Sequence, residues 1–398
     1  MMTAGEGGDA EDGGAAAKAE PAPTVRSGGI LAAQDLRALI AQGDIDADAA
    51  IGEEQVQPAS LDLRLADHAY RVRASFLPGP GATVAERLDA FAMHRFDLGD
   101  GAVLEKGCVY IVPLQERLAL KARIAGIANP KSSTGRLDVF TRLITDRSAV
   151  FDQVAHGYRG GLFAEISPRT FSVVVRRGSC LNQLRLRRGA PSGSDAAIRR
   201  LQDEVGLIDA GRGAADIADG IAVTVDLAGH AAGAVGGGGG ERPTVGWRAR
   251  HHTALIDFGR IGHYDPLEYW EPVHADGNGT LILNPGDFYI LASKETVTVP
   301  PDHAAEMRPY DTRVGEFRVH YAGFFDPGFG HAGSNGTGSR AVLEIRSFEV
   351  PFVLRDGQLV GRLVYERLTQ APDKLYGSGI GSSYQRQGLA LAKQFRRG

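Results

Sequence analysis

The segment Leu162-Phe-Ala-Glu-Ile166 returns near the other end of the chain as Val342-Leu-Glu-Ile345. In both copies the glutamate is followed thirteen residues later by the glycine of an Arg-x-Gly triplet, Gly178 or Gly357. Because the order and the spacing agree, we interpret the chain as an internal duplication. Two further pairs of segments recur in the same order: Ala59-Ser-Leu-Asp-Leu-Arg-Leu65 with Ala222-Val-Thr-Val-Asp-Leu-Ala228, and Gly107-Cys-Val-Tyr-Ile111 with Gly286-Asp-Phe-Tyr-Ile290.

Both copies begin with a helical pattern and continue as short strands. Apolar residues recur at helical spacing at the start of each copy, namely Leu36, Leu39 and Ile40, and Ile198, Leu201 and Val205. After each helix, short apolar runs alternate with Gly, Pro, Asp and Asn, which is typical of strands joined by turns. The sequence therefore predicts a mainly β protein of two tandem lobes. We place the lobes at 29–190 and 191–370, between a disordered leader at 1–28 and a C-terminal tail or lid at 371–398.

The composition fits a globular protein and excludes several classes of function. A chain of 398 residues, 43% hydrophobic and 23% charged, is long enough for two domains of ordinary size. A net charge of −4 gives no overall basic field for nucleic acid or an anionic membrane, and no stretch is long and apolar enough to span a membrane. The two cysteines are far apart, which excludes a disulfide framework and a cysteine-rich zinc site. Because the N-terminus lacks a signal-peptide pattern, we expect a cytoplasmic protein.

The segment Asn129-Pro-Lys-Ser-Ser-Thr-Gly-Arg136 is a candidate anion-binding motif. Two small hydroxyls, Ser132 and Ser133, let backbone N–H groups approach an anion, and the fork of Arg136 matches phosphate oxygens. A helical turn beginning here would add its N–H groups to the site. The alternative interpretation is a simple turn or helix cap.

Glu165 and Glu344 are candidate catalytic residues because each lies in an apolar strand. A carboxylate that points into a lobe is costly to bury, and desolvation raises its pKa towards neutral pH. Such a group suits a general base or a proton shuttle. The alternative is that strand alternation turns a glutamate to solvent, but its recurrence at one spacing favours a site. No spacing among the eleven histidines indicates a metal centre.

Taken in order, these segments resemble the metal-independent dCTP deaminases, which are grouped with the trimeric dUTPases. In the first half the similar segments are Pro58–Leu65, Lys131–Arg136, Gly157–Glu165 and Arg176–Gly178. In the second half they are Asp326-Pro-Gly, Glu344 and the tail Ser383-Tyr-Gln-Arg-Gln-Gly388. The resemblance covers about residues 30–394 and is greatest to the longer, tandem form of the family.

The resemblance implies two dUTPase-like lobes and hydrolytic deamination of dCTP to dUTP and ammonia, with no nucleic-acid or membrane partner. Glu165 or Glu344 would activate water for attack at C4 of cytosine. Magnesium would arrive with the triphosphate, no zinc would be bound, and the chain would form a homo-oligomer. The implied substrate-binding residues are Lys131, Ser132, Ser133 and Arg136 for the triphosphate, Asp326 for the 3′-hydroxyl, and Tyr384 and Gln387 in the closing tail.

Each half lacks a motif that the other retains, which leaves two arrangements open. The first half has Ala155-His-Gly157 where the family has Asp-Pro-Gly, while the second half has Arg308-Pro-Tyr-Asp-Thr-Arg313 in place of the phosphate motif. We favour a composite site that combines phosphate donors of the first half with Asp326, Glu344 and the tail. The competing site uses first halves only, with Glu165 and with Asp152 or His156 in place of the lost aspartate.

Two other functions remain open at the level of sequence. One is a dUTPase, or a bifunctional enzyme that also releases pyrophosphate; Ala155 argues against it, because that chemistry needs an aspartate to activate water at phosphorus. The other is a nucleotide-binding regulator without catalysis, suggested by the decay of motifs in each half. Retention of both glutamates argues against the regulator.

Overall fold

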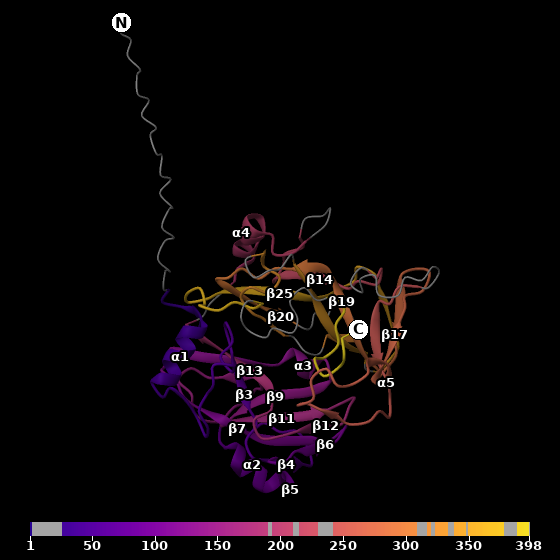
Figure 1. Cartoon of the computed structure of the whole chain (residues 1–398). Helices are drawn as coiled ribbons and strands as arrows, with labels where there is room; N and C mark the ends of the chain where they lie inside the picture. The colour runs from indigo at the N-terminus through magenta and orange to yellow at the C-terminus, as the bar shows by residue number, and fades with distance from the viewer. Residues whose placement is uncertain are drawn as a thin grey trace.

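The two copies fold as two β-lobes that lie one above the other (Figure 1). This arrangement comes from a computed structural model, which describes residue 1 and residues 26–189, 193–209, 215–229, 242–308, 317–319, 323–332, 338–347, 349–377 and 388–397. The first lobe is drawn in indigo to magenta and the second in orange to yellow. No helix in the described part of the chain is long and apolar enough to cross a membrane.

The first lobe is built from three sheets. In the first, the order is β1 (Gly29–Ile30), β13 (Cys180–Arg188), β8 (Ile124–Pro130) and β10 (Gln153–Val154), and β3 (Leu61–Arg64) also pairs with β13. The second has the order β5 (Ala92–Asp97), β4 (His68–Val72), β7 (Val109–Ala119), β11 (Arg159–Pro168) and β9 (Val139–Thr145), with β2 (Ile45–Ala47) on β7. The third is β6 (Ala102–Leu104), β12 (Val173–Val175) and β16 (Ile256–Asp257).

The second lobe repeats this topology. One sheet has the order β14 (Ile221–Thr224), β25 (Leu359–Arg367), β20 (His303–Arg308) and β22 (Phe324–Phe325). Another has β17 (Trp270–Val273), β15 (Gly246–Ala249), β19 (Phe288–Val297), β23 (Ser339–Ser347) and β21 (Phe317–Val319), and a third pairs β18 (Thr280–Leu283) with β24 (Phe352–Arg355). The neighbours β25-β20-β22 and β19-β23-β21 correspond to β13-β8-β10 and β7-β11-β9. The predicted duplication and the mainly β fold are therefore confirmed.

A short helix opens each lobe, as the apolar spacing predicts. In α1 (Ala33–Ala41), Leu36 and Leu39 are buried, and in α4 (Asp195–Val205) Ile198 is buried. Val205, the third apolar residue of that spacing, is 42% exposed, because α4 ends there and Gly206 leaves the helix in a left-handed conformation. The remaining helices are α2 (Val84–Phe91), α3 (Ser132–Gly135) and α5 (Pro266–Tyr269).

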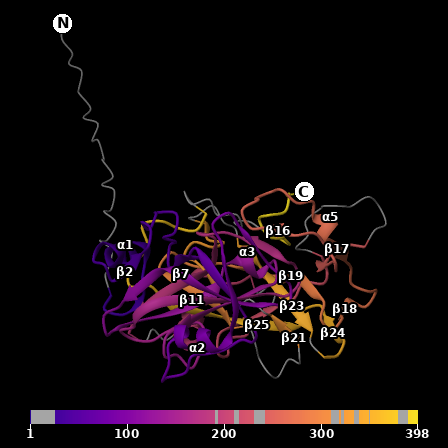
Figure 2. The same cartoon turned by 90° about the horizontal axis from the view of Figure 1, so that it is seen from below.

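The lobes exchange elements across their boundary. Strand β16 of the second lobe pairs in parallel with β12 of the first, and Ile30 of the first lobe forms a bridge to Leu368 of the second. Phe171 of the first lobe makes edge contacts with Tyr269 and Trp270. Seen from two directions, α3 lies on the boundary beside the second lobe (Figures 1 and 2). The exchanged elements fix the two lobes relative to each other, and so fix any site built between them.

Candidate active site

Glu344 of the second lobe faces Arg136 of the first across this boundary. Glu344 lies on β23 opposite Ile290 of β19, and Arg136 is the C-cap residue of α3. The Nε atom of Arg136 is 4.0 Å from Oε1 of Glu344, and both side chains are almost fully buried. Strand pairing in one lobe and a single helical turn in the other thus place a carboxylate against a guanidinium out of contact with bulk water.

Burial controls the protonation of Glu344. Desolvation raises its pKa to about 8, because the charged form loses its water. Arg136 acts in the opposite direction by favouring the carboxylate, whereas the negative charge of Asp138 raises the pKa further. A carboxyl group that titrates near neutral pH can exchange protons with a bound substrate.

We expect the free energy of unfolding to depend on pH through Glu344. Its pKa is raised in the folded state, so between pH 4.5 and about 8 the folded protein holds a proton that the unfolded chain releases. Stability contributed by the neutral group is therefore lost as pH rises through this window, by roughly 3–5 kcal/mol. Glu344→Gln removes this loss. Chemical denaturation should therefore show that the free energy of unfolding of the variant, relative to that of the wild type, is higher at pH 9 than at pH 5. An equal difference at both pH values would contradict the assignment.

The phosphate-motif residues lie beside Arg136 on the same turn. Lys131 forms an ion pair with Asp62 of β3, and Ser133 is buried while Ser132 is exposed. Neither serine hydroxyl has a hydrogen-bond partner among the residues that the structure describes. The hydroxyl groups can therefore bind a ligand without breaking an existing bond.

Asp326 is held next to this turn by an arginine of the first lobe. The Nη2 atom of Arg185, on β13, is 3.3 Å from Oδ1 of Asp326, and the guanidinium lies 3.9 Å from the ring centroid of Phe324. Burial raises the pKa of Asp326, Arg185 lowers it, and Asp62 raises it again. The electrostatic coupling to Asp62 places Asp326 near the Lys131 ion pair.

The end of the chain covers the same region. Nη1 of Arg136 donates to the carbonyl oxygen of Ala390 at 3.0 Å, and Phe395 packs against Tyr264 and Tyr269. Burial lowers the pKa of Lys393, and the positive charge of Lys131 lowers it further. The described part of the tail thus encloses the turn that carries Lys131 and Arg136.

Glu165 has a different environment, although it occupies the equivalent position on β11. Burial raises its pKa, while hydrogen bonds from the Ser75 hydroxyl and the Phe76 N–H act in the opposite direction. It lies opposite Arg142, which forms an ion pair with Asp152, and burial raises the pKa of Asp152 to about 6. The groups that act on Glu165 thus belong to its own lobe, and its Oε2 atom is buried with no hydrogen-bond partner among the residues that the structure describes.

The structure brings together the predicted residues of the composite arrangement. Within one chain, Arg136 is paired with Glu344, while Lys131 is paired with Asp62, whose charge acts on Asp326. The two groups meet at α3, which Lys131 and Arg136 cap at its two ends. Of the two residues proposed to replace the missing aspartate beside Glu165, His156 is exposed, whereas the charge of Asp152 acts on Glu165. Tyr384 and Gln387 lie outside the described residues.

Several residues of this region carried no usable sequence signal. Asp62 lies in a repeated segment, which could have marked it, but its pairing with Lys131 depends on the contact between β3 and β13. Arg185 belongs to an alternating run of Leu and Arg on β13, which resembles a strand with a solvent face. It is instead 1% exposed, because the second lobe covers that face.

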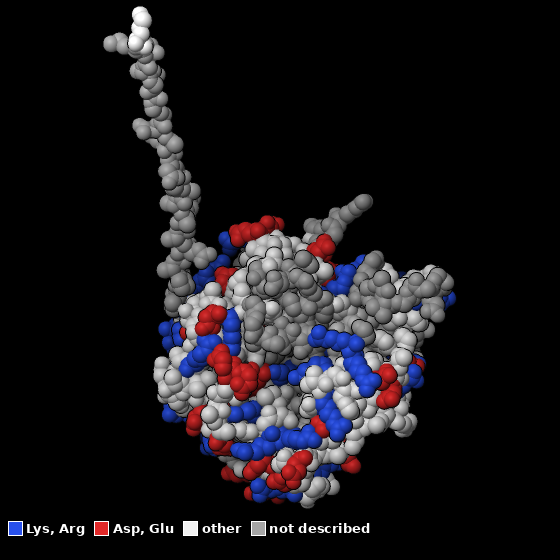
Figure 3. All heavy atoms as spheres, in the orientation of Figure 1, with Lys and Arg blue, Asp and Glu red and all other residues white. Residues whose placement is uncertain are grey.

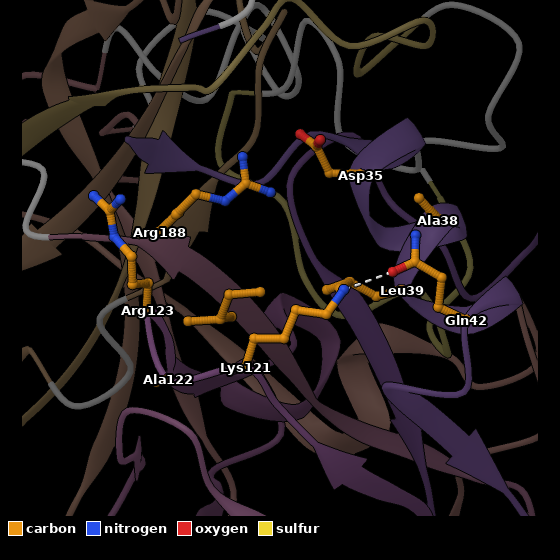
Figure 4. Close-up of a pocket in the computed structure, with 9 residues that line it drawn as sticks. Asp35, Ala38, Leu39, Gln42, Lys121, Ala122, Arg123 and Arg188 are labelled. Carbon is orange, nitrogen blue, oxygen red and sulfur yellow. Dashed lines mark hydrogen bonds between the residues drawn. The ribbon is translucent and has the colours of Figure 1, made fainter. Parts of the chain in front are cut away.

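Outside this site, the charged side chains and potential metal ligands of the described residues do not form a second candidate site. The face shown in Figure 3 carries intermixed positive and negative side chains. In the part of the chain that the structure describes, no three His, Cys, Asp or Glu side chains gather as metal ligands do. A pocket of about 360 Å³ between α1 and the start of β8 shares no residue with the site; Lys121, Arg123 and Arg188 line it, and Lys121 bonds to Gln42 (Figure 4).

The topology of both lobes is that of the dUTPase-like fold, here duplicated. Residues 27–190 match the family model of the 2′-deoxycytidine 5′-triphosphate deaminase (DCD) N-terminal domain, and residues 194–395 match that of the C-terminal domain. The chain belongs to the dCTP deaminase family.

Solved and curated relatives agree with this assignment. The crystal structure of 2′-deoxycytidine 5′-triphosphate deaminase from Agrobacterium tumefaciens is 53% identical, with a TM-score of 0.80 over 87% of this chain and 100% of that chain. A protein from Beutenbergia cavernae named "dCTP deaminase, dUMP-forming" is 34% identical over 142 residues, which are 34% of this chain and 67% of that protein. One of the same name from Halobacterium salinarum is 37% identical over 130 residues, 32% of this chain and 62% of that protein.

Proposed function

We propose that this chain deaminates dCTP by hydrolysis, giving dUTP and ammonia. The observation that carries the proposal is the buried pair of Glu344 and Arg136 across the lobe boundary. Membership of the dCTP deaminase family and the deaminase titles of its relatives support the choice of substrate. The site needs no metal-bound water, because Glu344 can itself accept a proton near neutral pH.

In this mechanism Glu344 moves the protons. Its carboxylate takes a proton from water as the oxygen forms a bond to C4 of cytosine and passes that proton to N3, which gives a tetrahedral adduct with a C4 hydroxyl and an N3–H. The carboxylate then takes the hydroxyl proton as the C4 carbonyl forms and gives it to the 4-amino group, so that the C4–N bond breaks and ammonia leaves. Arg136 stabilises the carboxylate at the start and the end of this cycle.

The remaining residues bind the rest of the nucleotide. We assign Ser132, Ser133 and Lys131 to the triphosphate, whose magnesium ion travels with the substrate. Asp326, positioned by Arg185, accepts a hydrogen bond from the 3′-hydroxyl. A role for Tyr384 and Gln387 in closing the tail, and a homo-oligomeric assembly, remain predictions.

A second candidate is a bifunctional enzyme that converts the product onward to dUMP and pyrophosphate. The curated relatives described as dUMP-forming favour it, and Asp326 retains the carboxylate that Ala155 lacks. Against it, Asp326 is largely buried and bonded to Arg185, which leaves its carboxylate less available to activate water at phosphorus.

One assay distinguishes these functions. Purified protein is incubated separately with dCTP and with dUTP in the presence of magnesium, and ammonia, pyrophosphate and nucleotides are measured. We expect one ammonia and one dUTP per dCTP consumed, and no reaction with dUTP. Equal amounts of ammonia, pyrophosphate and dUMP would establish the bifunctional enzyme. Binding of dCTP without turnover would overturn both proposals and leave a regulator.

A further inference from the structure

Beside the Glu344–Arg136 pair, a second ion pair crosses the lobe boundary with its charges reversed. Asp138 lies two residues beyond Arg136, and Arg346 lies two residues beyond Glu344. Nη2 of Arg346 bonds to Oδ2 of Asp138, so the first lobe supplies the acid and the second supplies the base. Because alternate residues of a strand point to the same face, Arg346 and Glu344 leave β23 on one side.

This second pair is buried and bonded from both lobes. Asp138 is fully buried, and its carboxylate also accepts a hydrogen bond from Oγ1 of Thr170 at 2.6 Å. Nη2 of Arg346 donates to Thr170 Oγ1 at 2.9 Å, and Nη1 donates to the carbonyl oxygen of Gly286 in its own lobe. Truncating either partner would leave a buried group with unmet bonds.

The backbone of Asp138 adopts a left-handed conformation and is hydrogen-bonded on both sides. Its φ is +54°, a left-handed value that is uncommon for residues other than glycine. The N–H of Asp138 donates to the carbonyl oxygen of Gly135, and its own carbonyl accepts from Arg169. The connection from α3 to β9, which carries Arg136, is therefore fixed at both ends.

The duplicated sequence indicates that this pair belongs to the composite site alone. Where the second copy reads Glu344-Ile-Arg346, the first reads Glu165-Ile-Ser167. Glu165 thus has no basic residue at the corresponding position, and the groups that act on its pKa, such as Ser75 and Arg142, belong to its own lobe. The two copies differ at this position although their glutamates are shared.

We infer that the Asp138–Arg346 ion pair is a positioning device for the proposed active site: it holds Arg136 opposite Glu344 and sets the electric field at the Glu344 carboxylate. The inference rests on the proposed function. The charged groups that face Glu344 are Arg136 and Asp138; β19 presents Ile290 opposite it, and Arg346 acts through Asp138. At Glu344 the negative charge of Asp138 raises the pKa, and its partner Arg346 opposes part of that charge.

The test is the pH profile of kcat/KM for ammonia release from dCTP. Asp138→Asn leaves Arg346 uncompensated and should lower the apparent pKa of the acidic limb by about half a unit or more. Arg346→Gln leaves Asp138 uncompensated and should raise it, and the double variant should lie between the two single variants. Both single variants should lower kcat by at least about tenfold, because Arg136 loses its position.

A matched control exists in another ion pair between the lobes. Arg176 of the first lobe bonds to both carboxylate oxygens of Asp257 in the second, at 2.6 and 2.8 Å, and neither residue is among the charges acting on Glu344. Asp257→Asn should therefore leave the acidic limb where it is in the wild type. If both single variants of the Asp138–Arg346 pair move the limb in one direction, or neither moves it, the positioning device is overturned.

Failure of the proposed function would be recognised separately. Wild-type protein that releases no ammonia from dCTP overturns the function, whatever the variants do. The titration of Glu344 is then followed by the free energy of unfolding as a function of pH, compared with Glu344→Gln in each background. If this apparent pKa of Glu344 falls in Asp138→Asn and rises in Arg346→Gln, the positioning device is supported. If it moves in the same direction in both variants, or moves in neither, the positioning device is overturned.

Discussion

Glu344→Gln is expected to lower kcat for ammonia release from dCTP by about 10²–10⁴-fold, the usual contribution of a general acid–base group. Glutamine keeps the size of the side chain but cannot take a proton from water. The pair with Arg136 would lose its charge but not its volume, so the fold should persist. Single-turnover kinetics with dCTP, together with the nucleotide Kd, separate lost chemistry from lost binding.

Glu165→Gln is the discriminating variant. Glu165 occupies the equivalent strand position and is also buried, but the groups that lower its pKa, Ser75, Phe76 and Arg142, all belong to the first lobe. We expect it to change kcat by less than about threefold, consistent with a group outside the reacting atoms. Full activity in Glu344→Gln with a large loss in Glu165→Gln would support the site made from first halves only.

Arg136→Gln is expected to produce the second largest effect, a loss of about 10²–10³-fold in kcat, similar to removal of one preorganised charge donor. Arg136 lowers the pKa of Glu344, so without it the glutamate stays protonated to higher pH. The acidic limb of the pH profile should therefore move upward as well. The tail would also lose its bond to Ala390, which is expected to raise KM.

Arg142→Gln provides the matched comparison in the first lobe. Arg142 lies opposite Glu165 in the pairing of β9 with β11 and forms an ion pair with Asp152. It should lower stability without displacing the acidic limb. An unchanged pH profile in Arg136→Gln would show that the buried pair does not control the general base.

The fold could be predicted because its signals are local. Alternating apolar runs, turn residues and recurring segments such as Gly107–Ile111 and Gly286–Ile290 lie within short windows of sequence. The apolar spacing predicted both opening helices, in which Leu36, Leu39 and Ile198 are buried and Val205 is exposed. The family relationship followed from the order of the motifs and is confirmed.

The site was predictable only as two alternatives, because each glutamate has nearly the same neighbours in sequence. What separates Glu344 from Glu165 is which distant segment covers it: α3 and the tail in one case, the segment at Ser75 and Phe76 in the other. The pairing of Arg185 with Asp326 likewise depends on contact between segments far apart in the chain. Such contacts follow from tertiary packing and leave no periodic pattern.

The elements exchanged between the lobes constrain the order in which the protein can be made. The hydrophobic core of the first lobe includes Trp270 and Phe288 and, from the last residues described, Ala392 and Phe395. During synthesis on the ribosome, the first lobe therefore cannot complete its core when its own residues emerge. It must wait for nearly the whole chain, and only then does Glu344 meet Arg136. A nascent chain stalled between the lobes would expose unfinished apolar surface to chaperones and would lack the composite site.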